Sequence, residues 1–246
     1  VSDLTRAEFE QALADPETDR YPLRRGIEFY HTYKEDISVE RARQYLNLSQ
    51  DAFIVTAFGK FRNREEIRMV LGAFRAWDEE HKMLLAPRLY PFSRRNSYGR
   101  NIIKRWISKA GYYLLMPLLN RMYKLQAGAN EELIDNCDLP YYMAASDVIF
   151  IQRKDILNSG NVPLAFLYHK VVVGPKVGNI GELLSETGNP TFDPDDKKDI
   201  LRALEEARRL AAWGQGEVNY AYGMENMSIR KVGQAYAQTY KQAING

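Results

Sequence analysis

The chain has 246 residues, of which 45% are hydrophobic and 27% charged, and its formal net charge is +2. This length and composition allow a sizeable buried core but are short for two complete α/β domains, so we expect one domain with insertions. The single cysteine, Cys137, excludes an intramolecular disulfide, and the longest apolar run, 112–119, is far below the ~20 residues that span a membrane.

The first part of the chain alternates predicted helices and strands. Residues 1–30 are polar, with a helix expected over 6–14, and are predicted to form a peripheral N-terminal segment or linker before a domain over 31–246. His31 lies among tyrosines and is interpreted as a packing residue. The next predicted elements are a helix over 38–46 with Ser38 as N-cap, a strand over 53–58, a turn over 59–63, a helix over 65–81 and a strand over 83–86.

Residues 81–130 form a basic segment, because they contain ten Lys or Arg and no Asp or Glu. Apolar and aromatic residues recur there at roughly helical spacing, which predicts a basic helical insertion. Such a helix either packs its apolar side on the domain or lies on an anionic membrane surface. No nucleic-acid motif accompanies it, so no nucleic-acid partner is expected. With no N-terminal signal pattern, the prediction is a cytoplasmic protein, free or peripheral at the inner face of the membrane.

The second part of the chain carries the most informative pattern, a strand, a polar loop, a helix, a strand and a Gly-rich loop over 144–194. The predicted elements of this part are helices over 129–136 and 141–145, a strand over 147–151, a helix opened by the loop 158–161, a strand over 171–173, a helix over 180–186, a strand over 191–192 and a helix over 196–212. Ligands of an open parallel sheet bind beyond the carboxyl ends of its strands, so the loops 158–161 and 174–181 are expected to face one pocket.

Several motifs in this order resemble one enzyme family. The run SDVIFIQRKDILNSGNVPLAFLYHKVVVGPKVGNIGELLSETGNPTFDPDD, over 146–196, resembles the donor-binding half of a GT-B glycosyltransferase of the retaining, glycogen-synthase-like group. The turn AFGKFRNR over 57–64 resembles the FGxxR turn of that group, and the tail over 225–246 resembles its closing helix. The resemblance implies a Rossmann-like parallel sheet flanked by helices, and an acceptor-binding N-terminal domain that this chain lacks.

The resemblance also implies which residues bind a nucleotide-sugar. The residues expected to bind its phosphates are Gly59, Lys60, Arg62, Arg64, Asn158, Ser159 and Gly160, and those expected to contact its sugar or nucleotide are Asp155, Gly178 and Glu182. A helix that begins at Ser159 and Gly160 would offer free backbone N–H groups to a phosphate. Each position also has an alternative role without a ligand. The cations would be solvated turn charges, Asp155 an ordinary loop acid, and Gly178 a residue that permits a backbone turn. Glu182 would interact favourably with the helix dipole at a helix start.

The chain departs from the family pattern at two places. The family commonly places an Arg after the turn glycine and a Lys five residues later, whereas this chain has Lys60 and Glu65, so Arg62 or Arg64 would supply the second cation. The two glutamates of the family, spaced eight residues apart, fall near 156–157 and 164–165, where no residue is acidic. No catalytic residue is assigned for this reason. His169 is interpreted as a helix-end residue.

The sequence therefore predicts a glycosyltransferase, hexosyltransferase-like and incomplete as this chain alone, that transfers a sugar from a nucleotide-diphosphate-sugar to a polysaccharide or glycolipid. No metal or other cofactor is expected, because no cluster of His, Cys and carboxylates has ligand spacing and GT-B enzymes generally need none. Two alternatives stay open: a non-catalytic nucleotide-sugar-binding or interaction module, which the missing glutamates favour, and a peripheral membrane scaffold built on the basic segment.

Overall fold

The computed structural model describes residues 37–89 and 137–245, together with residues 106, 110, 111, 113–115, 117–119, 121, 125, 126 and 134. The predicted N-terminal segment 1–30, its helix over 6–14, His31 and the helix over 129–136, apart from residue 134, lie outside the described residues, as does most of the basic segment. The described elements are α2 (Val39–Tyr45), β1 (Phe53–Thr56), α3 (Arg64–Ala76), β2 (Lys82–Leu85), β3 (Leu125–Gln126), α5 (Leu139–Ala145), β4 (Val148–Phe150), α6 (Asn161–Leu167), β5 (Val171–Pro175), α7 (Gly178–Glu186), β6 (Thr191–Phe192), α8 (Lys197–Ala212), α9 (Gln215–Asn226) and α10 (Ile229–Asn245).

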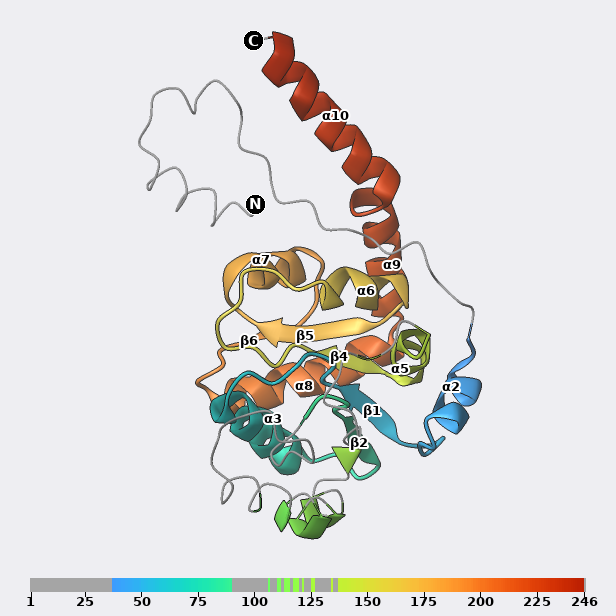
Figure 1. Ribbon diagram of the computed structural model, residues 1–246, viewed down its shortest axis with the longest axis vertical. Coiled ribbons are helices and arrows are strands. Elements are labelled where there is room, and N and C mark those ends of the chain that lie inside the picture. Colours follow the sequence, from blue (N-terminus) through green and yellow to red (C-terminus); the bar gives the residue numbers. More distant parts are fainter. Residues whose placement is uncertain are drawn as a thin grey trace.

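The strands form one six-stranded sheet in the order β3-β2-β1-β4-β5-β6, and every neighbouring pair is parallel. This order confirms the predicted α/β class with a Rossmann-like parallel sheet. In Figure 1, α6 and α7 lie on one side of β5 and α8 on the other, so helices cover both faces. The carboxyl ends of all the strands consequently meet at one edge, which is where the site must be sought.

Strand β5 shows how the core is divided between the two faces. All five of its residues are buried, as expected for a parallel strand covered on both sides. Because successive side chains of a strand point to opposite faces, Val171 and Val173 pack in the cluster that contains Ile200 of α8. Val172 packs instead in the cluster that contains Phe166 of α6.

The predicted helix starts are confirmed where a polar side chain caps them. Ser38 Oγ accepts a hydrogen bond from Arg41 N (3.2 Å) at α2, and the N-cap Asp196 accepts one from Lys198 N (2.8 Å) at α8. Helix α3 ends at Ala76, five residues earlier than predicted. Three acidic residues follow Trp77, and negative charge is unfavourable at a helix C-terminus, where the dipole is negative.

Two elements were not predicted. Leu125 and Gln126 form the edge strand β3, parallel to β2, inside the segment 81–130 that is predicted to be a basic helical insertion. Described residues between 106 and 121 are helical, so this segment connects β2 to a further strand of the sheet. A two-residue strand has no periodicity to detect. Helix α9 precedes the closing helix α10, which extends away from the sheet in Figure 1.

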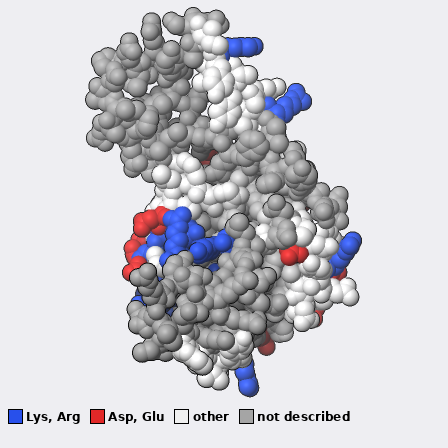
Figure 2. All heavy atoms as spheres, in the orientation of Figure 1, with Lys and Arg blue, Asp and Glu red and all other residues white. Residues whose placement is uncertain are grey.

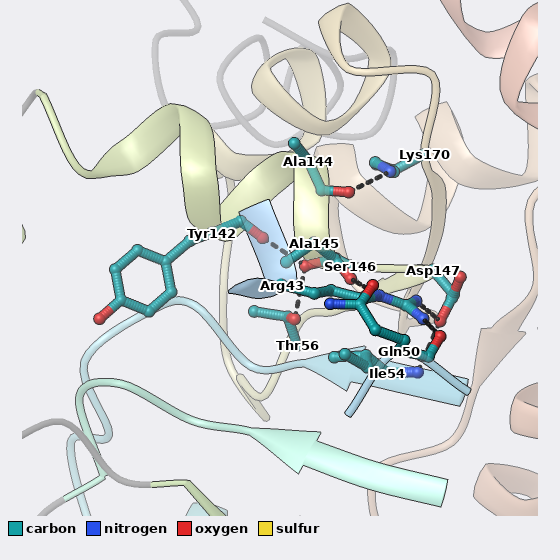
Figure 3. A network of polar contacts seen from close by, with 10 residues as sticks. All are labelled: Arg43, Gln50, Ile54, Thr56, Tyr142, Ala144, Ala145, Ser146, Asp147 and Lys170. Carbon is teal, nitrogen blue, oxygen red and sulfur yellow. Dashed lines mark hydrogen bonds and ion pairs between the residues drawn. The ribbon is translucent and has the colours of Figure 1, made fainter. Parts of the chain in front are cut away.

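A buried arginine ties the amino edge of the sheet together, opposite the edge where the strands end (Figure 3). Arg43 of α2 is 6% exposed and donates to Ala145 O (3.2 Å), Gln50 O (2.6 Å) and Asp147 Oδ2 (2.8 Å). Asp147 Oδ2 also accepts from Ile54 N (2.6 Å). Arg43 Nε, NH1 and NH2 and Ile54 N each have an acceptor, so the network holds α2 and α5 against β1 and β4.

Candidate functional site

The loops after β1, β4, β5 and β6 gather at the carboxyl edge of the sheet around a pocket of about 440 Å³. The pocket is lined by Asn63, Glu65, Lys154, Asp155, Lys176, Val177, Asp193, Pro194 and Asp195. Figure 2 shows Lys and Arg gathered at the side of the molecule toward which β5 points, with Asp and Glu along their border. Four carboxylates and two lysines line the pocket, so its interior is more acidic than basic.

Lys154 connects two of these loops rather than facing the pocket as a free cation. Its Nζ forms ion pairs with Asp195 Oδ1 and, at 3.5 Å, with Glu65 Oε2. The hydrogen bond to Asp195 raises the pKa of Lys154, and the smaller opposing effect is desolvation of the ammonium group. The lysine therefore stays charged and bridges the β4–α6 loop to the β6–α8 loop.

The turn between β1 and α3 presents the predicted cations from a fixed backbone. Asn63 Oδ1 accepts from Glu66 N (2.9 Å), and Glu66 Oε2 accepts from Arg62 N (2.6 Å). Arg153 NH1 then donates to Glu66 Oε2 (3.0 Å), and both side chains of this pair are largely buried. The spacing Asn63-x-x-Glu66 resembles a capping box and could have been recognised from the sequence.

Lys60, Arg62 and Arg64 are exposed on this turn, and their side chains form no ion pair within the described part of the chain. None of the three lines the acidic pocket. The structure therefore brings the predicted cations to the carboxyl edge but separates them from the pocket interior. Three charges on one turn, none of them paired with a described residue, favour an anionic ligand.

The loop between β4 and α6 is joined to α7. Asn179 Nδ2 donates to Asn158 Oδ1 (2.6 Å), and Ser159 Oγ accepts from Asn161 N (3.3 Å). Helix α6 begins at Asn161, so the prediction of a helix starting at Ser159 and Gly160 was wrong by one to two residues. Gly160 is its N-cap and is exposed, which leaves backbone there accessible.

Gly178 allows the two loops to pack. Its φ is +56°, and a Cβ at this position would lie 2.4 Å from Ile156 O, so no side chain fits. Asp155 is exposed on the rim of the pocket, and Glu182 is half-buried on α7. The predicted sugar-contact residues Asp155 and Gly178 are thus on neighbouring loops of one edge, as the topology requires.

His169 and Cys137 do not line the pocket at the carboxyl edge. His169 stands at the end of α6, with its ring stacked on Tyr220 at 4.0 Å between centroids and Nδ1 2.8 Å from Glu217 Oε1. Cys137 is exposed and forms no disulfide. Among the described residues no group of three or more His, Cys, Asp or Glu could hold a metal ion, and no helix is long and apolar enough to cross a membrane.

Comparison of this architecture with solved structures finds glycosyltransferases. WaaG, a glycosyltransferase involved in lipopolysaccharide biosynthesis, superposes with a TM-score of 0.60 at 15% identity over 91% of this chain and 57% of its own. Anabaena HepE in complex with UDP-glucose gives 0.54 at 18% identity over 82% and 52%. The C-terminal domain of the group 1 glycosyltransferase LpcC from Francisella tularensis superposes with a TM-score of 0.56 at 10% identity. The match covers 83% of this chain and 100% of the LpcC domain.

The fold is that of one GT-B half-domain. The chain spans about half the length of WaaG and HepE, and it matches the whole of the isolated C-terminal domain of LpcC, so the resemblance to one half of a GT-B glycosyltransferase is confirmed at the level of fold. No family model and no curated protein matches the sequence itself. At these identities the likeness establishes the GT-B architecture, whereas activity depends on the residues at the carboxyl edge of the sheet.

Proposed function

We propose that this chain is the donor-binding half of a glycosyltransferase and that the carboxyl edge of its sheet binds a nucleotide-diphosphate-sugar. The observation that carries the proposal is the β1–α3 turn, where Lys60, Arg62 and Arg64 are exposed and unpaired within the described chain. Glu66 and Arg153 hold this turn rigid, so the cations are positioned before any ligand arrives. Preorganised cations suit the developing charge of a nucleotide-diphosphate leaving group.

The acceptor belongs to the other half of the proposed enzyme. We place a polysaccharide or a glycolipid there, since WaaG acts in lipopolysaccharide biosynthesis and the chain covers only about half of WaaG. In this proposal the reaction needs both halves, and the half described here supplies nucleotide-sugar binding and stabilisation of the departing diphosphate. No metal is part of the proposal, and the Lys and Arg side chains take the role of the counter-ion.

A second candidate is a non-catalytic nucleotide-sugar-binding module. The observation that favours it is the apolar character of α6: Leu164 and Ala165 stand where the family carries its second glutamate, and both are buried in the core. No carboxylate can therefore reach a bound ribose from these positions. Turnover with a complete two-domain protein separates the two candidates, because both of them bind the nucleotide-sugar and only the enzyme transfers the sugar.

The binding test is thermal unfolding of the chain with UDP-, GDP- and dTDP-sugars and the corresponding free diphosphates. A ligand that binds only the folded state stabilises it by about 2.7 kcal/mol at a hundredfold excess over its Kd, so a shift in Tm is expected with one base. The shift should vanish in Arg62→Ala/Arg64→Ala. It should persist in the matched control Arg230→Ala/Lys231→Ala, which removes two exposed charges of α10. A folded wild-type chain that none of these ligands stabilises would remove the proposal.

A further inference from the structure

Two buried donor atoms of the described chain have no hydrogen-bond partner, and both lie at the carboxyl edge of the sheet. They are Gln152 Nε2, just beyond β4, and Arg88 Nε, just beyond β2. Strand β1 lies between β2 and β4, so the two donors flank the loop that carries Lys60 and Arg62. Buried hydrogen-bond donors without acceptors are rare in folded proteins, and each one therefore indicates a functional role or a missing partner.

Gln152 differs from the two residues that follow it in the same loop. Arg153 is bonded to Glu66, and Lys154 is bonded to Asp195. Gln152 is more deeply buried than either, with 1% exposure, and its NH₂ group has no acceptor among the described residues. Of these three side chains, the most buried one is therefore the one whose donor has no hydrogen-bond acceptor.

The Gln152 amide lies directly beneath Gly59. A Cβ on Gly59 would be 2.6 Å from Gln152 Nε2 and 3.4 Å from Gln152 Cδ, so any side chain at position 59 would displace the amide. Gly59 itself is half-exposed and is followed by exposed Lys60. The amide is thus separated from the surface of the cationic turn only by a residue without a side chain.

Stability alone does not account for an amide at this position. Leucine has a similar size and would fill the same space beside β4 without an unpaired donor, whereas burying an amide NH₂ without a partner destabilises the fold. A polar group retained at a cost to stability, at the edge where ligands of parallel sheets bind, indicates a partner that is absent from the free chain.

We infer that Gln152 is a donor-site residue whose NH₂ group hydrogen-bonds the diphosphate of the nucleotide-sugar. This inference rests on the proposed function. The Gln152 side chain rotates toward the surface beside Gly59, where no Cβ blocks the amide. Its NH₂ group then donates to a phosphate oxygen that is bound by the neighbouring cations. An oxygen-rich anion is the ligand that an amide donor and the charges of Lys60 and Arg62 recognise together.

The test compares Gln152→Leu with Gln215→Leu as a matched control. Gln215 is a second glutamine amide, distant from the carboxyl edge, and its Nε2 donates to Thr187 O (2.8 Å) and Asn219 Oδ1 (3.0 Å). Affinities of the whole 246-residue chain for UDP, GDP and dTDP are measured by isothermal titration, and Tm is measured without nucleotide. Gln152→Leu should weaken diphosphate binding roughly 10- to 100-fold, the effect of one hydrogen bond to a charged group, with Tm unchanged or raised. Gln215→Leu should lower Tm and leave binding unchanged.

Three outcomes would overturn the inference. Equal diphosphate affinity of wild type and Gln152→Leu would show that the amide does not contact the ligand, while the proposed function would stand. A Gln152→Leu Tm well below that of wild type would show that the amide is a structural group with a partner in the free chain. Absence of binding of all three diphosphates by the wild-type chain would instead remove the proposed function, and this inference with it.

Discussion

The buried ion pair beneath the cationic turn gives the sharpest stability prediction. Glu66 is 4% exposed in its side chain and receives hydrogen bonds from Arg62 N and Arg153 NH1, whose own side chain is 13% exposed. Glu66→Ala leaves the Arg153 guanidinium buried without its carboxylate, which costs about 3–5 kcal/mol. For a domain of this size such a loss lowers Tm by roughly 10 °C.

The neighbouring residue provides a control of the same type. Glu65 has a side chain that is 68% exposed and is 3.5 Å from Lys154 Nζ, so Glu65→Ala should cost at most about 1 kcal/mol. Both variants are compared with wild type by urea unfolding at pH 7. The double variant Glu66→Ala/Arg153→Met should be less destabilised than Glu66→Ala alone, because no unpaired buried charge remains.

A specific result would refute this reasoning. If Glu66→Ala lies within about 1 kcal/mol of Glu65→Ala, the ion pair contributes no more than a surface contact, and the turn is not rigidly held in the way the proposed function requires. If the double variant loses as much as Glu66→Ala and the single variant Arg153→Met lose in sum, the two side chains are energetically independent despite their 3.0 Å separation.

Two further predictions concern neighbouring parts of the same edge. Gly178→Ala should destabilise the chain by about 2 kcal/mol or more in urea unfolding, because position 178 has a positive φ and a Cβ there would collide with Ile156 O; a loss below 1 kcal/mol would contradict this. Burial opposes ionisation of Asp199, but hydrogen bonds from Arg202 and from a backbone N–H outweigh it and lower the pKa of Asp199 below its usual 3.8. The contribution of Asp199 to the free energy of unfolding is therefore complete above about pH 4 and is lost as the pH falls through the lowered pKa. Asp199→Asn should be less stable than wild type at pH 7 and equal to it in strong acid. A difference in stability that widens as the pH falls would refute this assignment.

The two proposals connect these predictions to activity. In the proposed function, a rigid β1–α3 turn positions Lys60, Arg62 and Arg64 for a diphosphate. Glu66→Ala removes no cation but releases this turn, so it should also weaken nucleotide binding. The control Glu65→Ala leaves the capping contacts of Asn63 and Arg62 in place and should therefore leave the turn ordered. Binding and stability are thus expected to fall together at Glu66, whereas at Gln152 binding should fall while stability is unchanged or rises.

The order and type of most elements follow from the sequence by itself, because they depend on interactions between neighbours in the chain. Ser38 and Asp196 cap helices through bonds that span two or three residues, and the buried run at 171–173 reads as a strand from its composition alone. The parallel arrangement follows from the alternation of strands and helices. The resemblance of several motifs in order was enough to predict the GT-B half-domain, and the fold confirms it.

Tertiary structure alone decided how the carboxyl edge is built. Glu66 and Arg153 are 87 residues apart in the chain and meet only because β1 and β4 are adjacent and in register. The same pairing places Gln152 beneath Gly59, and within the described part of the chain it pairs Lys154 with Asp195 while Lys60 and Arg62 have no such partner. Such contacts depend on strand order and on the packing of loops, which no local pattern encodes, since hydrogen bonds between distant residues form only after the sheet has assembled.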